Sequence, residues 1–287
     1  MICLLGFGEV GQTFAEDLHT GFTIWDVKFS DPDSIPSKAA ARLGLAVPAG
    51  AREAVAQADV VVCAVTAAQD KAAAESVAGL TKSGAFFLDV NSASPGQKRE
   101  AAAVIEAAGA RYVEGVIMSP IGNKRLASPV LLGGPHAEAF LPVAQEIGFS
   151  GASFYGTELG LASATKLCRS VIVKGMEALL TESMLAARHY GVERAVLDSL
   201  RDFFPGTEWE TLARYMVSRA VQHGTRRAEE MREAARTVAD AGLNPRMSNA
   251  TAELQDWAAA FKQALPYEEL PSFLDALRAG TADQAKE

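Results

Sequence analysis

The sequence predicts an α/β protein in which a doubly wound parallel sheet is followed by a domain made only of helices. Up to about residue 155, continuously apolar runs such as VVVCAV and AFFLDV alternate with segments of helical periodicity. Runs of this kind are expected of strands that are buried on both faces of a parallel sheet. Beyond Gly156 no convincing strand follows. We therefore expect two domains, residues 1–156 and 157–287, within the 287-residue chain.

Each expected element rests on the period of its apolar residues and on the turn residues around it. Strands are predicted at 2–6, 22–26, 45–47, 59–65, 85–90, 111–117 and 129–133, with an edge at Phe154 and Tyr155. Helices are predicted between them at 8–19, 34–43, 51–57, 67–78, 95–108 and 135–147. A long helix from Glu158 to Tyr190 then precedes helices near 193–203, 208–222, 225–241, 248–263 and 267–279. The break after residue 222 is placed at His223 and Gly224, because glycine commonly ends a helix.

Composition narrows the range of partners and compartments. The net charge of −8 and the isoelectric point near 5.2 argue against nucleic acid or an anionic membrane as the main partner. A strand that begins at residue 2 leaves no room for a signal peptide, and no apolar run approaches membrane-spanning length. Cys3, Cys63 and Cys168 lie in apolar stretches, so we expect buried free thiols and a cytoplasmic protein. No cysteine pair or histidine cluster predicts a metal site.

Six residues near the N-terminus, GFGEVG, carry the spacing G-x-G-x-x-G in Gly6, Gly8 and Gly11. The motif lies between a predicted strand and a predicted helix. In that context the first glycine permits a tight turn, the second lets a pyrophosphate approach the backbone, and the third lets helix and strand pack closely. The start of the helix offers unpaired N–H groups to phosphates. We therefore predict a dinucleotide site, with a plain glycine-rich turn as the alternative.

Asp26 ends the second predicted strand, 20 residues after Gly6. At that distance a carboxylate can accept hydrogen bonds from the adenosine ribose, which strengthens the dinucleotide interpretation. The same charge would repel the additional phosphate of NADP. Lys28 is a cation that would instead favour that phosphate. We expect NAD as the cofactor, with NADP as the alternative.

Two later segments carry polar residues suited to chemistry. DVNSASP, residues 89–95, leaves a predicted buried strand, and ligands bind at the carboxyl ends of such strands. A capped turn is the plainer interpretation of this segment. Further on, Lys166, Ser170 and Lys174 share one stripe of the long predicted helix, with Arg169 beside it. A lysine on such a helix usually reaches solvent, whereas in a cleft it is suited to proton transfer.

Together these segments resemble the β-hydroxyacid dehydrogenase superfamily, which includes 6-phosphogluconate and 3-hydroxyisobutyrate dehydrogenases. GFGEVG matches the glycine fingerprint of that family, DVNSASP matches its D-x-S-T-x-x-P substrate loop, and the stretch around Lys166 matches its G-x-x-x-K-x-x-x-N motif in part. KLCRS followed by VKGMEALLTES is similar to a branch whose helical domain is of unknown function. The resemblance implies an N-terminal Rossmann-type domain, a helical C-terminal domain and a homodimer.

The chain departs from the family pattern in three places. Ser170 stands where the family has an asparagine, and EGVIMSP, residues 114–120, replaces D-A-P-V-S-G-G. The proline of that segment has no N–H to offer to an anion. The family motif K-D-L appears as EEM at residues 229–231, and Arg226 or Arg227 is the candidate replacement for its lysine. The resemblance therefore predicts a conserved reaction with a rebuilt substrate pocket.

The resemblance also implies a role for each site residue. The catalytic residues are Lys166, Ser92 and Ser170; the cofactor contacts are Gly6, Phe7, Gly8, Glu9, Val10, Gly11, Asp26, Val65, Thr66 and Asn91; the substrate contacts are Ser92, Met118, Ser119, Arg169 and Ser170. We expect an NAD(P)-dependent oxidoreductase that transfers a hydride between nicotinamide and a small hydroxy acid or related carbonyl compound. Lys166 would be the general acid/base, and the substrate would be a small, anionic molecule. An imine reductase of the same architecture and a non-catalytic nucleotide-binding sensor are the alternatives.

Overall fold

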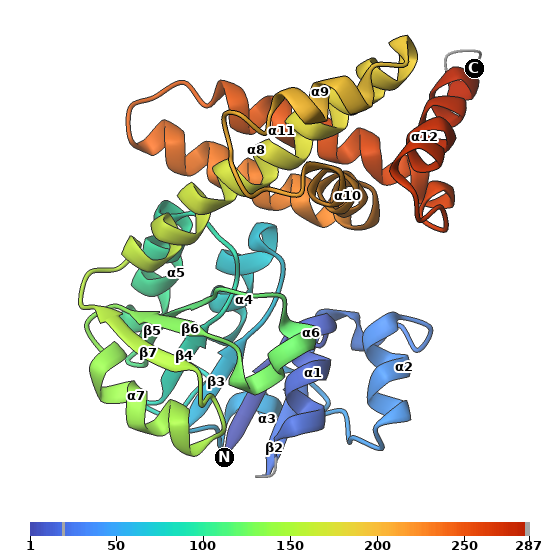
Figure 1. Ribbon diagram of the computed structural model, residues 1–287. Coiled ribbons are helices and arrows are strands. Elements are labelled where there is room, and N and C mark those ends of the chain that lie inside the picture. The colour runs from blue at the N-terminus through green and yellow to red at the C-terminus, as the bar shows by residue number, and fades with distance from the viewer. Residues whose placement is uncertain (19–20, 285–287) are drawn as a thin grey trace. The chain divides into compact units, whose positions relative to one another are not determined.

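The computed structural model describes residues 1–18 and 21–284, and the chain divides into two compact units. The first unit is Met1–Lys166 and the second is Leu167–Glu287 (Figure 1). The boundary falls within a long helix, further along the chain than Gly156. An α/β unit is thus followed by a helical one, which confirms the predicted fold class.

A mostly parallel sheet forms the centre of the first unit. Among the described residues its seven strands lie in the order β2-β1-β3-β4-β5-β6-β7. They are β1 (Ile2–Leu5), β2 (Phe22–Trp25), β3 (Val60–Cys63), β4 (Phe86–Asp89), β5 (Arg111–Ile117), β6 (Val130–Gly133) and β7 (Ala152–Gly156). Neighbouring strands pair in parallel except β5 and β6, which are antiparallel. The carboxyl ends of β1 to β5 therefore lie at one edge of the sheet, where ligands bind in folds of this kind.

Helices cover both faces of this sheet (Figure 1). They are α1 (Glu9–Asp17), α2 (Ile35–Arg42), α3 (Ala51–Val55), α4 (Asp70–Val77), α5 (Pro95–Ala107), α6 (Ile121–Lys124) and α7 (Ala137–Glu146), with short 3₁₀ turns at Val27–Ser30, Ala67–Gln69 and Arg125–Ala127. Alternate strand residues point to opposite faces. Leu4 and Val62 pack in the same core as Phe14 of α1, whereas Cys3 and Val61 belong to a second core with α3, α4 and α5.

The second unit contains helices and no strand among its described residues. Its elements are the greater part of α8 (Leu161–Tyr190), α9 (Glu193–Ser199), α10 (Trp209–Asp240), α11 (Arg246–Ala258), a 3₁₀ helix (Ala259–Ala264) and α12 (Leu270–Gln284). The main core of this unit joins side chains of α8, α9, α10 and α12, including Met184, Val217 and Phe273. No helix in the described part of the chain is both long and apolar enough to cross a membrane.

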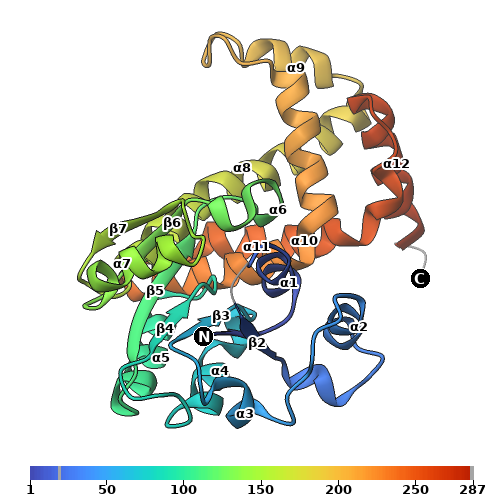
Figure 2. The same cartoon turned by 90° about the horizontal axis from the view of Figure 1, so that it is seen from below.

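The prediction of a helix break at His223 and Gly224 is wrong. The α10 helix runs without interruption through both residues, as Figure 2 shows. A Cβ atom on Gly224 would lie 2.1 Å from the carbonyl oxygen of Gln255 in α11. The glycine thus permits two helices to cross closely, which is a packing role that its sequence position does not reveal.

Two other expectations are also wrong. Residues 45–47 form no strand, and together with Phe22, Thr23 and Ile24 they line a cavity beside the outer edge of β2. Pro48, next in the chain, has no N–H with which to continue the hydrogen bonds of a strand.

The cysteines differ from expectation at one position. Cys168 is exposed on α8, while Cys3 and Cys63 are buried as expected. Burial raises the pKa of the Cys3 thiol to about 11.

The glycine loop provides a test of the packing between β1 and α1. A Cβ atom on Gly11 would lie 2.1 Å from the carbonyl oxygen of Gly6, so Gly11→Ala must push the helix away from the strand. We expect a loss of at least about 2 kcal/mol in the free energy of unfolding, measured by urea denaturation. Gly8→Ala is the matched control, because its Cβ would meet no described atom within 4 Å. Equal stability of Gly11→Ala and the wild type would contradict this packing.

Candidate active site

The glycine loop connects β1 to α1 at the carboxyl edge of the sheet. Gly6 has a φ of +94°, and a Cβ there would lie 2.5 Å from the carbonyl oxygen of Ala64. At Gly8, in contrast, an added Cβ would meet no described atom within 4 Å. The first and third glycines are therefore required for packing, and the second keeps the backbone accessible. This division of roles is what a pyrophosphate-binding loop requires.

The first turn of α1 completes this loop. Gly8 is the N-cap residue, and helix geometry leaves the N–H groups of Glu9, Val10 and Gly11 without partners inside the helix. The side chain of Phe7 is fully buried, and its N–H donates to Asp26 Oδ2 at 2.8 Å. The helix N-terminus is thus suited to an anion, while Phe7 supports the loop from within the core.

Asp26 lies directly after β2 and is held by two backbone groups. Its Oδ2 accepts from Phe7 N at 2.8 Å and its Oδ1 accepts from Lys28 N at 2.9 Å. Each carboxylate oxygen keeps a lone pair for a further donor. The half-buried carboxylate is therefore oriented in advance, while Lys28 is exposed. These residues fit a ribose beside the glycine loop.

Asn91 connects the ends of two neighbouring strands. Its Oδ1 accepts from Val65 N at 2.6 Å, beyond β3, and its Nδ2 donates to Asp70 Oδ1 at 2.7 Å. Nδ2 also lies 3.4 Å from the Cys63 sulfur. Asn91 is 4% exposed, so its amide holds the backbone of Val65 from the interior of the protein. Thr66, next in the chain, is exposed.

A buried ion pair lies beneath this connection. Asp89 at the end of β4 pairs with Lys98 of α5, with Oδ1 and Nζ 2.7 Å apart, and neither side chain is exposed. Asp89 Oδ2 accepts from the Tyr112 hydroxyl at 2.5 Å, and Asp89 Oδ1 accepts from Asn91 N at 2.9 Å. We call Asp70, Asp89, Asn91, Lys98 and Tyr112 the Asp89 network.

Ionisation within the Asp89 network follows from burial and from its charges. Burial and the charge of Asp89 raise the pKa of Asp70 to about 8. Burial opposes the charged form of Lys98, but the carboxylates of Asp89 and Asp70 hold its pKa above the usual value. Burial and the same two carboxylates raise the pKa of Tyr112 well above its usual range. At neutral pH the network is therefore an Asp89–Lys98 ion pair with a protonated Asp70.

Lys166 lies within hydrogen-bond distance of the loop after β4. Its Nζ donates to Ser92 Oγ at 2.8 Å, and both residues belong to the first unit. Lys166 lies on the second turn of α8, and the first turn of this helix is anchored by the buried Glu114 of β5. The two oxygens of Glu114 accept from Gly160 N and Ser163 N, each at 2.8 Å. A carboxylate at a helix N-terminus is stabilised by both hydrogen bonds and the helix dipole.

The predicted substrate contacts lie in both units. Met118 and Ser119 follow β5 in the first unit, where Met118 N donates to Pro129 O at 2.9 Å. Ser119 Oγ is buried and has no partner among the described residues. Ser170 and Arg169 belong to the second unit. There Ser170 is buried and accepts from Lys174 Nζ at 3.0 Å, whereas Arg169 is exposed.

The two arginines considered as replacements for the family lysine differ in environment. Arg227 is buried in the second unit and pairs with Glu177, so its guanidinium is used inside the helical core. Arg226 is half-exposed and pairs with Glu230 at 2.6 Å. A role for either residue at a cofactor stays a prediction.

Sequence inspection missed the residues that support the site, namely Asp70, Lys98, Tyr112 and Glu114. One usable signal was present for Lys98. It shares the buried face of α5 with Ala101, Ala102 and Ile105, and a lysine among apolar residues requires a buried acid. Asp70 gives no such signal, because an acidic residue in the first turn of a helix is common.

The raised pKa of Asp70 predicts a pH dependence of stability. From its ordinary pKa of 3.8 up to about 8, the folded state retains a proton that the unfolded state releases. The free energy of unfolding should therefore fall as the pH rises through this window. Asp70→Asn mimics the protonated carboxyl and should remove this loss, gaining roughly 1–3 kcal/mol relative to wild type between pH 5 and pH 8. Urea denaturation at several pH values measures it.

Glu75→Gln is the control for this measurement, because Glu75 lies on the exposed side of the same helix. The free energy of unfolding of Glu75→Gln should change with pH in the same way as that of the wild type. Parallel stability curves for Asp70→Asn and the wild type would mean that Asp70 is ionised in the folded protein.

Comparisons with known proteins agree with the fold and with an NAD-binding domain in the first unit. Residues 1–141 match the NAD binding domain of 6-phosphogluconate dehydrogenase, and residues 187–258 match a domain of unknown function. A conserved hypothetical protein from Sinorhizobium meliloti is 34% identical, with a TM-score of 0.76 over 96% of this chain and 95% of its own.

Two further solved structures share the fold. A conserved protein described as structurally similar to 3-hydroxyacid dehydrogenases is 28% identical, with a TM-score of 0.70 over 90% of this chain and 96% of its own. The 3-hydroxyisobutyrate dehydrogenase of Mycobacterium tuberculosis is 20% identical, with a TM-score of 0.73 over 96% of this chain and 98% of its own. The chain therefore belongs to one family with the Sinorhizobium meliloti protein, and it joins an NAD-binding domain of the 6-phosphogluconate dehydrogenase type to a C-terminal domain of unknown function.

Proposed function

We propose that the protein is an NAD(P)-dependent oxidoreductase acting on a small hydroxy acid or a related carbonyl compound. The observation that carries the proposal is the hydrogen bond between Lys166 and Ser92. It places an amine beside the loop after β4, at the same edge of the sheet as the glycine loop. A proton-transfer group and a dinucleotide site at one sheet edge are the two parts that such a reaction requires.

The cofactor would be held by the glycine loop and by Asp26. The open side of Gly8 and the N–H groups at the start of α1 suit the pyrophosphate, and the oriented carboxylate of Asp26 suits the adenosine ribose. Val65, fixed by Asn91, and Thr66 would lie beside the nicotinamide. When bound, the nicotinamide supplies or accepts the hydride.

Lys166 would move the proton that accompanies the hydride. In reduction its ammonium donates a proton to the carbonyl oxygen, and in oxidation its neutral amine accepts the hydroxyl proton. Ser92 Oγ accepts from Nζ and so directs the amine toward the loop after β4. Met118, Ser119, Ser170 and Arg169 stay candidates for substrate contacts. The Ser119 hydroxyl is buried and makes no hydrogen bond with a described residue.

Two alternatives are distinguished by turnover. An imine reductase of the same architecture would reduce a C=N bond, and the presence of Lys166 favours the carbonyl reaction over it. A nucleotide-binding sensor would bind the cofactor without turnover. An absorbance assay with hydroxy acids, sugar acids and cyclic imines, each with both cofactors, separates the three functions.

A homodimer is the proposed assembly. The family resemblance supports it, and so do large apolar side chains on the outer face of α8. Ile172 is 66% exposed and Leu179, two turns later, is 59% exposed. Exposed apolar side chains in one stripe are typical of an interface. Light scattering should then give twice the 30.3 kDa of one chain.

The role of Lys166 predicts a specific kinetic defect. Lys166→Met should lower kcat by about 10²–10⁴-fold, the usual effect of losing a general acid/base, without weakening cofactor binding. Lys71→Met is the matched control, because Lys71 is exposed and pairs with Glu100. Turnover of Lys166→Met near the wild-type rate would exclude the role.

The environment of Asp26 predicts preference for NAD. Fluorescence titration should give tighter binding of NADH than of NADPH, because the carboxylate repels the additional phosphate. Asp26→Asn should reduce the ratio of NADH affinity to NADPH affinity by about tenfold. Lys28→Met should weaken the binding of NADPH and leave the binding of NADH unchanged. Gly8→Ala should weaken the binding of both cofactors without changing the free energy of unfolding. Tighter binding of NADPH by the wild type would overturn the preference.

A further inference from the structure

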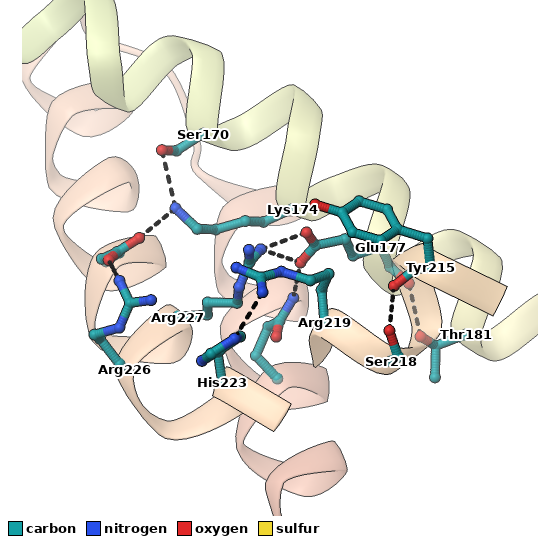
Figure 3. A network of polar contacts seen from close by, with 12 residues as sticks. Ser170, Lys174, Glu177, Thr181, Tyr215, Ser218, Arg219, His223, Arg226 and Arg227 are labelled. Atoms are coloured by element: carbon teal, nitrogen blue, oxygen red, sulfur yellow. Dashed lines mark hydrogen bonds and ion pairs between the residues drawn. The ribbon is translucent and has the colours of Figure 1, made fainter. Parts of the chain in front are cut away.

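The helical unit contains a polar network between α8, α10 and α11 (Figure 3). Glu177 of α8 pairs with Arg227 of α10 and accepts from Gln255 Nε2 of α11 at 3.1 Å. One turn earlier on α8, Lys174 Nζ lies 2.5 Å from Glu230 of α10. Most of these side chains are buried, so the balance of their charges matters for stability.

This network holds more positive than negative charge. Among the described residues that interact in it, four cations face two carboxylates; they are Lys174, Arg219, Arg226 and Arg227 against Glu177 and Glu230. The whole chain has the opposite balance, with a net charge of −8. Arg226 is 51% exposed, so solvent screens part of this excess; the partly buried remainder favours an anion.

Arg219 differs from the other three cations of the network, each of which pairs with Glu177 or Glu230. The structure shows no carboxylate bonded to it in the described part of the chain; its Nη1 lies 2.7 Å from His223 Nε2. Its Nε is buried and makes no hydrogen bond with a described residue. Figure 3 shows Arg219 and His223 side by side on α10, next to Arg227. Nε and an Nη are the two donors with which a guanidinium binds an oxyanion in bidentate geometry.

We propose that Arg219, together with His223 and Arg226, forms an anion-binding site in the helical unit that takes the carboxylate or phosphate group of a small molecule. Arg219 would present Nε and one Nη to two oxygens of the anion. Arg226 would contribute charge from the next turns of the same helix. The site goes beyond the proposed hydride transfer and does not depend on it.

The pKa of His223 would report whether an anion is bound to Arg219. Burial and the charges of Arg219, Arg226 and Arg227 hold its pKa at about 4, with Glu230 opposing them. Lys174 and Glu177 are the charged residues of α8 in the same network. In the absence of an anion, neutral His223 accepts from Arg219. An anion on Arg219 would add a negative charge nearby, and the pKa of His223 should rise by about 1–3 units.

The experiment is an NMR pH titration of the histidine rings in the full chain. Inorganic phosphate and malonate are the probes, and sodium chloride of equal ionic strength is the reference. His189 is the internal control, because it lies 3.0 Å from an arginine, Arg278, elsewhere in the same unit. We expect both probes, or one of them, to raise the pKa of His223 and to leave that of His189 unchanged.

Two variants test the assignment. Arg219→Gln should weaken the response of His223 to the probe by at least about tenfold and raise its pKa in the probe-free protein, because one neighbouring charge is lost. Arg278→Gln is the matched control and should respond as the wild type does. If Arg219→Gln fails to fold, the comparison of His223 with His189 in the wild type still decides.

An unchanged His223 titration in phosphate and malonate would overturn the proposal. Equal shifts of His223 and His189 would also overturn it, because they would report an adventitious ion only. Hydride transfer without a response at His223 would leave the proposed function intact and reject this site. A response at His223 without any turnover would support the anion site and reject the proposed hydride transfer.

Discussion

The buried pair of Asp89 and Lys98 is the constraint on which the candidate site depends. Two fully buried charges are tolerated when each is offset by the other and their remaining hydrogen-bonding capacity is satisfied. Asp89 meets this condition through Tyr112 and the backbone of Asn91, and Lys98 also donates to Asp89 O at 3.1 Å. The loop after β4 is held in place as a consequence. Asn91 can then fix Val65, so that the ends of β3 and β4 form one rigid edge.

A second buried carboxylate determines where the proposed acid/base stands. Glu114 accepts from the first N–H groups of α8, so the helix begins at a defined place on β5. Gly133, on the neighbouring strand, leaves room for this side chain, since a Cβ there would lie 2.7 Å from Glu114 Oε2. Lys166 follows on the second turn and reaches Ser92. Two interior acids, on β4 and β5, thus position the two partners of one hydrogen bond.

The helical unit handles buried charge in a different way. In its polar network the carboxylates of Glu177 and Glu230 are each paired with a cation, and the cations of that network outnumber them. In the sheet unit the Asp89 network is balanced by protonation of Asp70, which burial favours. Arginine cannot release its charge in the same way, because its pKa is too high. A permanent excess of arginine charge therefore calls for an external anion, whereas an excess of aspartate can be relieved by a proton.

The sequence by itself determined the α/β architecture and the place of the glycine loop, and it identified Asp26 and the segment around Lys166 as candidates. These features depend on local patterns, since the period of apolar residues and the spacing of glycines are set by residues close together in the chain. What only the tertiary structure decided is which polar residues are buried and against what. Lys98 and Asp70 become partners of Asp89 and Asn91 through strand pairing, and Gly224 lies inside α10 because α11 crosses there. Burial is a property of elements that meet from distant parts of the chain, and no local pattern records which of them will meet.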